Sequence, residues 1–406
     1  MCLCLEFLME KATRQHTKEH NRALVLRTIF AHEQISRAEI ARVTKLTRTT
    51  VSSIVSDIIT EGLVEEVGVG TSYGGKNPIL LSLVEDSRWM IGLDLSHNEF
   101  RGAIVNLRGV ICDVIAMSIE GYDGDDALEI LYQIVDRLIK KAATHPLLGI
   151  GVGTPGLVNT QEGVIINAVN LNWKDLPLTH LLQERYNLPV YVLNDSQAAA
   201  IGEKTFGKGY SPEESMVLIN IRHGIGSGII IHGSLFQGDG GCAGEIGHIV
   251  VVKEGGELCR CGNHGCLETV ASAQALIKKA RAGIKDFPES ILPHEPKQIN
   301  LAAIQKAFNA NDPFAQRLVF DTAHYIGMVI SDVVSILNIQ KIVFVGDMTC
   351  FGEPWLNAIR NSAQKYSLQK PILNTKIEIG QSGENSIILG ATVILATDYS
   401  LLFTHS

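Results

Sequence analysis

Three cysteines lie within the eight-residue segment CRCGNHGC at 259–266, and His248 lies eleven residues before the first of them. Three thiolates and one imidazole form a Cys3His set, which is the closed tetrahedral geometry of structural zinc. No coordination position is then left for water, so the metal folds the loop and does no hydrolysis. We therefore predict a structural Zn2+ bound by His248, Cys259, Cys261 and Cys266.

A disulfide or a redox pair is the alternative use of the same three cysteines. A disulfide framework needs an even number of cysteines and an oxidising compartment, and the chain has only 8 cysteines in 406 residues. A redox pair requires the spacing C-x-x-C, which this segment does not have. The spacing of the three cysteines therefore favours a metal site over a disulfide or a redox pair.

The composition is that of an ordinary soluble protein of two or three domains. Hydrophobic residues make up 46% of the chain and charged residues 19%, which is typical of globular proteins with a sizeable core. The first ten residues have no basic leader, and Glu6 breaks their apolar run, which argues against a signal peptide. No apolar stretch reaches the ~20 residues that a membrane helix needs. We expect a cytoplasmic protein with no membrane partner.

The net charge of −8 is unevenly distributed along the chain. Residues 11–56 carry nine Lys or Arg side chains against three Glu, whereas the part after residue 84 carries 25 basic and 34 acidic side chains. An acidic body with a basic N-terminal arm indicates a polyanionic partner at one end only, although a solvated charged face gives the same count. The pattern within the arm decides between the two.

The basic arm has the pattern of helices followed by a hairpin. Residues 21–31 place apolar side chains on one stripe and predict an amphipathic helix. Ser36, with Glu39 three residues later, forms a capping box that starts a short helix, and Thr47 caps a second helix that Gly62 ends. Two β-prone runs then flank the sequence TSYGGK and predict a hairpin with a basic tip.

This order of elements is that of a helix-turn-helix followed by a wing. The exposed side of the second helix carries arginine, threonine and serine side chains, which hydrogen-bond phosphate oxygens or base edges, and no acid lies among them before Asp57. A small three-helix dimerisation module is the alternative. The predicted DNA-facing residues are Arg37, Thr47, Arg48, Thr49, Thr50, Ser52, Ser53 and Lys76.

The chain beyond the hairpin alternates strands and helices. Residues 89–120 predict three antiparallel strands, and a helix follows from Asp126 to about Ala143. Later segments repeat the strand-turn-strand pattern, before a long helical segment at 313–337 and the strand KIVFVGD at 341–347. Two repeats of strands followed by helices indicate two α/β lobes around a cleft.

The whole arrangement resembles the ROK family, which comprises repressors, open reading frames and kinases. The arm is similar to the winged-helix domain of that family, although its wing reads GGKNP at 74–78 where GGRP is usual. The order of the remaining elements looks like the sugar kinase/actin-like ATPase fold. The motifs that carry the resemblance are TPG (154–156), NLNW (170–173), LNDSQAAA (193–200), GEIGH (244–248) and CRCGNHGCLE (259–268).

The resemblance implies a sugar site. In ROK proteins the glutamate and histidine of E-x-G-H, and the glutamate after the cysteine cluster, contact a sugar. The N-D pair of the family contains the base toward the phosphorylated hydroxyl in kinases. Carboxylates suit such a site because a sugar offers paired hydroxyl donors. Carried over to this chain, the predicted sugar contacts are Asn170, Asn194, Asp195, Glu245, His248 and Glu268.

The same resemblance predicts that ATP is no longer bound. ROK kinases carry D-x-G-G-T on the first hairpin, where glycines let backbone N–H groups approach the ATP phosphates, and here the stretch reads DLSHN at 94–98. The second phosphate loop, normally G-T-G-x-G, reads RHGIG at 222–226, and the adenosine-side G-G-G has become VGD at 345–347. Three losses along one nucleotide path argue against catalysis.

The sequence therefore predicts a sugar-responsive transcriptional repressor with an α/β fold. A winged helix-turn-helix (20–84) is followed by a two-lobed sugar kinase/actin-like ATPase fold with structural zinc (85–397), between an N-terminal extension (1–19) and a tail (398–406). We expect a small sugar effector, a palindromic operator and a homodimer or homotetramer. Two alternatives stay open: a sugar kinase with an added DNA-binding arm, and a repressor controlled by a protein partner instead of a sugar.

Overall fold

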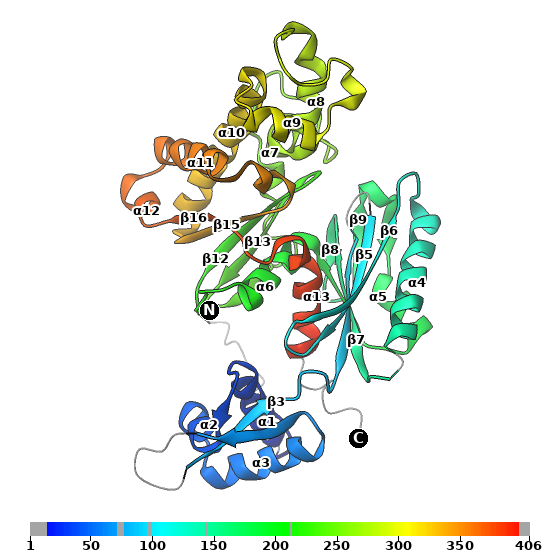
Figure 1. Ribbon diagram of the computed structural model, residues 1–406, viewed down its shortest axis with the longest axis vertical. Helices are drawn as coiled ribbons and strands as arrows, with labels where there is room; N and C mark the ends of the chain where they lie inside the picture. Colours follow the sequence, from blue (N-terminus) through cyan, green and yellow to red (C-terminus); the bar gives the residue numbers. More distant parts are fainter. Residues whose placement is uncertain (1–13, 71–76, 96–98, 143, 212, 398–406) are drawn as a thin grey trace, which may run out of the picture.

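The chain forms a small N-terminal body and two α/β lobes, arranged along one long axis (Figure 1). The computed structural model describes residues 14–70, 77–95, 99–142, 144–211 and 213–397. The predicted hairpin tip with Lys76, the loop residues 96–98, residues 1–13 of the predicted extension and the predicted tail lie outside the described residues.

The N-terminal body packs three helices against a small antiparallel sheet of order β1-β3-β2. The predicted hairpin of β2 and β3 is confirmed, and the two-residue strand β1 is an addition that the sequence pattern does not predict. The elements of this body are α1 (Arg14–Phe30), β1 (Ile35–Ser36), α2 (Arg37–Thr44), α3 (Arg48–Thr60), β2 (Val64–Val69) and β3 (Ile79–Leu83).

The ends of α2 and α3 lie where their polar residues predict them. Ser36 and Glu39 cap one another at the start of α2, each side chain accepting from the backbone N–H of the other residue. Thr47 Oγ1 caps α3 by accepting from the Thr50 backbone N–H at 3.2 Å. Gly62 follows α3 with φ at 71°, a conformation that costs a glycine little because it has no Cβ. Hydrogen bonds between neighbouring residues thus fix the start of each helix, and a glycine follows the second.

The first lobe is built on a five-stranded sheet of order β11-β7-β4-β5-β6. Strands β4, β5 and β6 are antiparallel, as predicted, and β7 and β11 run parallel to β4. The parallel strands therefore end at one edge, which brings Asp94 and Asn194 to the same side of the lobe. The main elements are β4 (Trp89–Asp94), β5 (Glu99–Asn106), β6 (Ile111–Ser118), α4 (Gly124–Lys141), β7 (Leu147–Thr154), α5 (Leu178–Tyr186) and β11 (Val190–Asn194).

A small sheet of order β10-β9-β8 extends the first lobe beside the cleft. Its buried Trp173 donates from Nε1 to the Gly124 carbonyl at 2.8 Å, which ties the small sheet to the start of α4. Its elements are β8 (Leu157–Asn159), β9 (Val164–Ala168), the short helix η1 (Val169–Leu171) and β10 (Trp173–Leu176).

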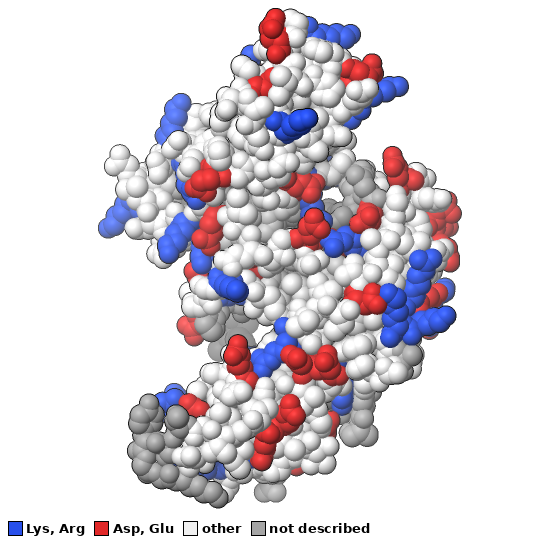
Figure 2. Space-filling view, viewed as in Figure 1, with Lys and Arg blue, Asp and Glu red and all other residues white. Residues whose placement is uncertain are grey.

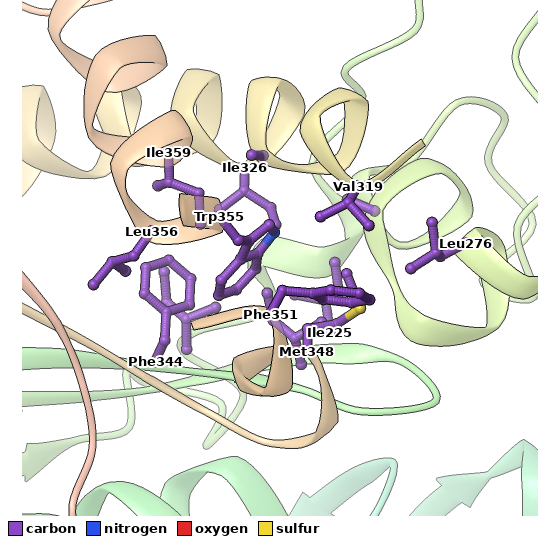
Figure 3. Close-up of a cluster of buried hydrophobic side chains, with 14 of the residues drawn as sticks. Ile225, Leu276, Val319, Ile326, Phe344, Met348, Phe351, Trp355, Leu356 and Ile359 are labelled. Carbon is purple, nitrogen blue, oxygen red and sulfur yellow. The ribbon is translucent and has the colours of Figure 1, made fainter. Parts of the chain in front are cut away.

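The second lobe has a five-stranded sheet of order β14-β13-β12-β15-β16. Figure 3 shows its core, where Trp355 packs against Phe344 with ring centroids 5.3 Å apart. The strands are β12 (Met216–Ile221), β13 (Ile225–Ile231), β14 (Ser234–Phe236), β15 (Lys341–Val345) and β16 (Lys376–Ile379). The helices are α7 (Leu267–Ala271), α8 (Ala273–Gly283), α9 (Leu301–Asn309), α10 (Pro313–Leu337), α11 (Gly352–Tyr366) and α12 (Gln369–Leu373).

Helix α10 is the single described helix that is long and apolar enough to cross a membrane by length and composition. More than half of its apolar window is buried, and Val319 and Ile326 lie in the core of the second lobe (Figure 3). Core packing therefore accounts for the apolar character of this helix.

Two helices, α6 (Asp195–Phe206) and α13 (Ser386–Thr397), cross between the sheets of the two lobes (Figure 1). They approach very closely at Gly202 and Gly390. A Cβ at Gly390 would lie 1.7 Å from the Ala198 carbonyl oxygen, and one at Gly202 would lie 2.1 Å from that of Ser386. Both positions therefore require glycine, and the helix pair joins the lobes at the floor of the cleft.

The N-terminal body is docked on the first lobe. Met90, Leu107 and Leu148 of that lobe are buried in one apolar cluster with the core of the N-terminal body. Arg108, in the turn between β5 and β6, donates to the carbonyls of Phe30 at 2.8 Å and His32 at 2.9 Å, at the end of α1. These contacts make one continuous core and give the last turn of α1 a cationic partner.

Candidate functional site

The predicted metal ligands come together in one cluster. The ligand atoms of His248, Cys259, Cys261 and Cys266 all lie within 4.8 Å of one another. The Cys261 and Cys266 sulfurs are 3.6 Å apart, too far for a disulfide and close to the roughly 3.8 Å between two sulfurs of a tetrahedral site with bonds of about 2.3 Å. His248 Nδ1 lies 3.5 Å from the Cys259 sulfur. The donor set therefore fits a metal ion such as zinc.

The chain around this cluster turns tightly at Gly265. Its φ is 74°, and a Cβ there would lie 1.9 Å from the Val252 carbonyl oxygen, so no other residue fits. Helix α7 begins directly after the ligand Cys266, and Glu268 lies in its first turn. The position of Glu268 thus depends on the fold of the cysteine loop.

A cavity of about 960 Å3 lies between the two lobes. Figure 2 shows acidic and basic side chains close together in the hollow between the lobes. The structure brings to the wall of this one cavity all six residues matched to sugar contacts, Asn170, Asn194, Asp195, Glu245, His248 and Glu268.

Asp195 is the first residue of α6 and lies at the floor of the cavity. Its Oδ1 accepts from the Ser196 backbone N–H at 2.6 Å and from the Ser196 hydroxyl at 3.0 Å. Burial and the nearby charge of Asp94 raise the pKa of Asp195 to about 6, against the opposing effect of Arg222. Asn194 caps the same helix and donates from Nδ2 to the Gly156 carbonyl at 3.0 Å, which holds the pair in place.

Glu268 is held by a residue that the motif comparison does not single out. Its Oε2 accepts from the Ile225 backbone N–H at 2.9 Å and from Arg260 Nη2 at 2.8 Å. Arg260 also donates from Nη1 to Asn170 Oδ1 at 2.8 Å. The only sequence signal for Arg260 is its place between two predicted metal ligands, and that spacing says nothing about its partners.

His248 lies between the metal cluster and the cavity. One ring nitrogen faces the Cys259 sulfur, and Nε2 lies 3.8 Å from Glu245 Oε2. Burial in the cleft, followed by the charges of Asp195 and Glu268, raises the pKa of Glu245 to about 7. The Glu245 side chain is still 40% exposed to the cavity, so its carboxylate can meet a hydroxyl group there.

The family model described as "ROK family" matches residues 90–398. The chain belongs to the ROK family. It is 32% identical over 386 residues to a xylose repressor of Caldicellulosiruptor bescii, covering 94% of this chain and 96% of the relative. A glucokinase of Halalkalibacterium halodurans is 35% identical over 311 residues, which are 75% of this chain and 93% of the kinase.

A solved structure shows the same full-length correspondence. The crystal structure of a ROK family transcriptional regulator, a homologue of the E. coli MLC protein, superposes with a TM-score of 0.84 at 28% identity. The superposition covers 95% of this chain and 98% of the regulator's chain. The two-lobed α/β fold predicted from the sequence is therefore confirmed as that of ROK proteins.

An ion pair joins the two stretches that the motif comparison matches to phosphate loops. Arg222, at the end of β12, donates from Nη1 to the fully buried Asp94 Oδ2 at 3.1 Å. Burial alone lowers the pKa of Arg222, and the carboxylates of Asp94, Asp195 and Asp347 reverse this, so its pKa is raised. The Arg222 guanidinium therefore lines the inter-lobe cavity and is paired with a carboxylate of the first lobe.

Most of the residues predicted to face DNA lie at the start of α2 or on α3 and its N-cap. Arg48, Thr49, Ser52 and Ser53 are exposed on α3. Thr47 is exposed too, but its hydroxyl caps the helix and contacts the Thr49 and Thr50 hydroxyls. Arg37, at the start of α2, donates to Glu66 at 2.8 Å, and Lys76 lies outside the described residues.

Proposed function

We propose that this protein is a sugar-responsive transcriptional repressor that binds operator DNA through its N-terminal body and a small sugar through its inter-lobe cavity. The observation that carries the proposal is the convergence of six side chains, matched by motif to sugar contacts, on one cavity. Hydrogen-bond acceptors dominate that set, and a sugar presents paired hydroxyl donors to them. The full-length similarity to a xylose repressor supports it, and makes D-xylose the first sugar to test.

The proposed DNA-binding unit is a winged helix-turn-helix of residues 20–84. Helix α3 serves as the recognition helix, since it exposes arginine, threonine and serine, which are side chains that hydrogen-bond phosphates and base edges. The sugar-sensing body covers residues 85–397. A homodimer or homotetramer in the cytoplasm, bound to an approximately palindromic operator, follows from the two-fold symmetry usual in such regulators.

The proposed zinc is structural. His248, Cys259, Cys261 and Cys266 would hold it, and the metal supplies cross-linking of the loop rather than catalysis, because four protein ligands leave no open position. By fixing the fold of the cysteine loop, the metal would hold Glu268 and Arg260 at the wall of the cavity.

A sugar kinase is the second candidate, because Asp195 lines the cavity, its motif matches that of the base in ROK kinases, and a glucokinase is among the relatives. The Arg222–Asp94 ion pair favours the repressor, since a partly buried guanidinium lies where the motif comparison expects a phosphate loop and is already paired with the Asp94 carboxylate. A coupled assay of ATP consumption with D-xylose or D-glucose decides between them. Turnover that depends on the sugar and on Asp195 would establish the kinase.

The central test is a DNA-binding titration. The protein selects its operator from a random DNA pool, and the affinity for that operator is measured by fluorescence anisotropy with and without D-xylose, D-glucose and N-acetyl-D-glucosamine. We expect one of these sugars to weaken operator binding at least tenfold. Failure to enrich any DNA, or operator affinity that no sugar changes, would contradict the proposal.

Arg48→Ala is expected to weaken binding to every DNA sequence and to lower the slope of log affinity against log salt by about one unit. The reason is the loss of one phosphate contact and of the counterion it displaces. Arg137→Ala, an exposed arginine on α4, is the matched control. If Arg48→Ala equals the parent at every salt concentration, α3 is not the recognition helix.

Arg108→Met is expected to uncouple sugar from DNA. The sugar affinity and the sugar-free operator affinity should each stay within about threefold of the parent, while the sugar-induced loss of operator affinity becomes roughly 3- to 10-fold smaller. The reason is that Arg108 joins the first lobe to the end of α1. Lys140→Met, exposed on α4, controls for charge. Unchanged coupling in Arg108→Met would rule out this route.

A further inference from the structure

The Arg260 guanidinium spans the cleft between the two lobes. Nη1 donates to Asn170 Oδ1, on η1 of the first lobe, and Nη2 donates to Glu268 Oε2, on α7 of the second lobe, both at 2.8 Å. The planar fork of arginine suits two acceptors on different elements, which a lysine ammonium on a single nitrogen serves less well. Arg260 therefore connects two of the six cavity residues across the lobes.

The bond to Arg260 also orients the Glu268 carboxylate. Both of its donors, Arg260 and the Ile225 N–H, contact Oε2, and among the described residues none donates to Oε1. The described part of the chain thus engages only one oxygen of this side chain, which is 10% exposed. The other oxygen is left as an acceptor for a hydroxyl group in the cavity.

Gly224 makes this arrangement possible. A Cβ at Gly224 would lie 2.3 Å from Glu268 Oε2 and 2.5 Å from Arg260 Nη2, so a side chain there would displace both groups. Gly224 belongs to the segment RHGIG, in which the preceding two positions have lost the residues of the phosphate loop. The glycine at position 224 fits a role in making room for the Arg260–Glu268 pair rather than for a nucleotide.

We infer that Arg260 is a positioning residue of the sugar site, which presents Glu268 to the sugar and holds the two lobes together around it. The inference rests on the proposed sugar-sensing function. Because Arg260 lies between the metal ligands Cys259 and Cys261, the metal-bound loop sets the reach of its side chain. The cysteine loop thereby positions both Glu268, which accepts a hydrogen bond from the sugar, and Arg260, which orients the Glu268 carboxylate.

The test is calorimetric titration of the full-length, zinc-loaded protein with D-xylose, D-glucose and N-acetyl-D-glucosamine. For the sugar that the parent binds most tightly, Arg260→Ala is expected to raise Kd by roughly 10- to 100-fold, as for loss of hydrogen bonds to a charged group. Arg260→Lys, which keeps the charge but not the fork, should lie between Arg260→Ala and the parent. His264→Ala, an exposed residue of the same loop that does not line the cavity, should match the parent.

A double-mutant cycle separates positioning from a general effect on the loop. Asn170→Ala and Arg260→Ala remove the same bridge, so their combined effect on Kd should be clearly smaller than the product of the single effects. Zinc content and melting temperature are measured for each variant, and Arg260→Lys carries the test if Arg260→Ala loses zinc.

The outcomes distinguish this inference from the proposed function. If the parent binds none of the sugars, both are overturned. If the parent binds a sugar and the zinc-loaded Arg260 variants bind it equally tightly, the inference is wrong while the repressor stands. Independent effects of Asn170→Ala and Arg260→Ala would likewise overturn the cross-lobe bridge.

Discussion

Asp195→Asn is expected to leave the sugar-free affinity for operator DNA unchanged and to abolish the release of DNA by sugar. Asp195 lines the inter-lobe cavity and is not part of the apolar cluster of the N-terminal body, so we expect that DNA binding itself does not involve it. The substitution removes a charged acceptor that a sugar hydroxyl can meet. Hydrogen bonds to charged groups contribute roughly 1.5–3 kcal/mol each.

That magnitude is enough to control the switch. A ligand shifts a two-state equilibrium only by its differential affinity for the two states, and a tenfold change in operator affinity needs about 1.4 kcal/mol. One acceptor that engages the sugar only when the lobes close therefore accounts for the response. We predict that lobe closure reaches the N-terminal body through the first lobe, on which that body is docked.

The measurement is operator binding with increasing sugar, for the parent and for Asp195→Asn. Asp332→Asn, an exposed carboxylate on α10, is the control for loss of one negative charge. If Asp195→Asn still releases DNA at the parental sugar concentration, Asp195 takes no part in sensing.

The same variant carries a stability prediction with a defined sign. Burial and Asp94 raise the pKa of Asp195 to about 6 in the folded protein, above its value of about 3.9 in the unfolded chain. The contribution of Asp195 to the free energy of unfolding is therefore fully present below about pH 4, and it is lost as the pH rises through about 6. Asp195→Asn removes a group that is costly to ionise, so it should melt higher than the parent at pH 8 and show a much smaller gain at pH 4. Equal gains at both pH values would contradict this.

Cys261→Ser is expected to reduce the bound zinc from about one ion per chain to near zero and to abolish the sugar response. A structural zinc site contributes much of the local folding free energy, and serine is a poor ligand in place of a thiolate. Without the ion, the loop no longer fixes α7, and Glu268 and Arg260 lose their places at the cavity. Operator binding without sugar should persist, because the N-terminal body has its own apolar cluster.

Elemental analysis of the purified protein measures the zinc, and hydrogen exchange over 245–271 measures the order of the loop. Cys112→Ser, an exposed cysteine on β6 away from the cluster, is the matched control. A parent protein without a stoichiometric metal ion would overturn the zinc assignment. A zinc-free Cys261→Ser protein that still responds to sugar would show that the metal does not support the sugar site.

The sequence by itself determined those features whose physical causes lie within a few residues of one another. The capping box of Ser36 and Glu39, the Thr47 cap and the clustering of three cysteines within one loop follow from short-range geometry that the spacing states directly. The antiparallel strands and the two lobes follow from periodicity and order. The six candidate sugar residues came from family motifs. A motif gives the place of each residue along the chain, but it does not give the residue's contacts.

Only the tertiary structure decided which distant side chains meet. Arg260 contacts Asn170 across 90 residues of sequence, Arg222 contacts Asp94 across 128, and Arg108 contacts the His32 carbonyl across 76. Nothing in the spacing of an isolated arginine indicates its partner, because the pairing depends on the order of strands in a sheet and on how two lobes and a docked body face one another. The raised pKa of Asp195 has the same origin, since it depends on burial and on the Asp94 carboxylate at the end of β4.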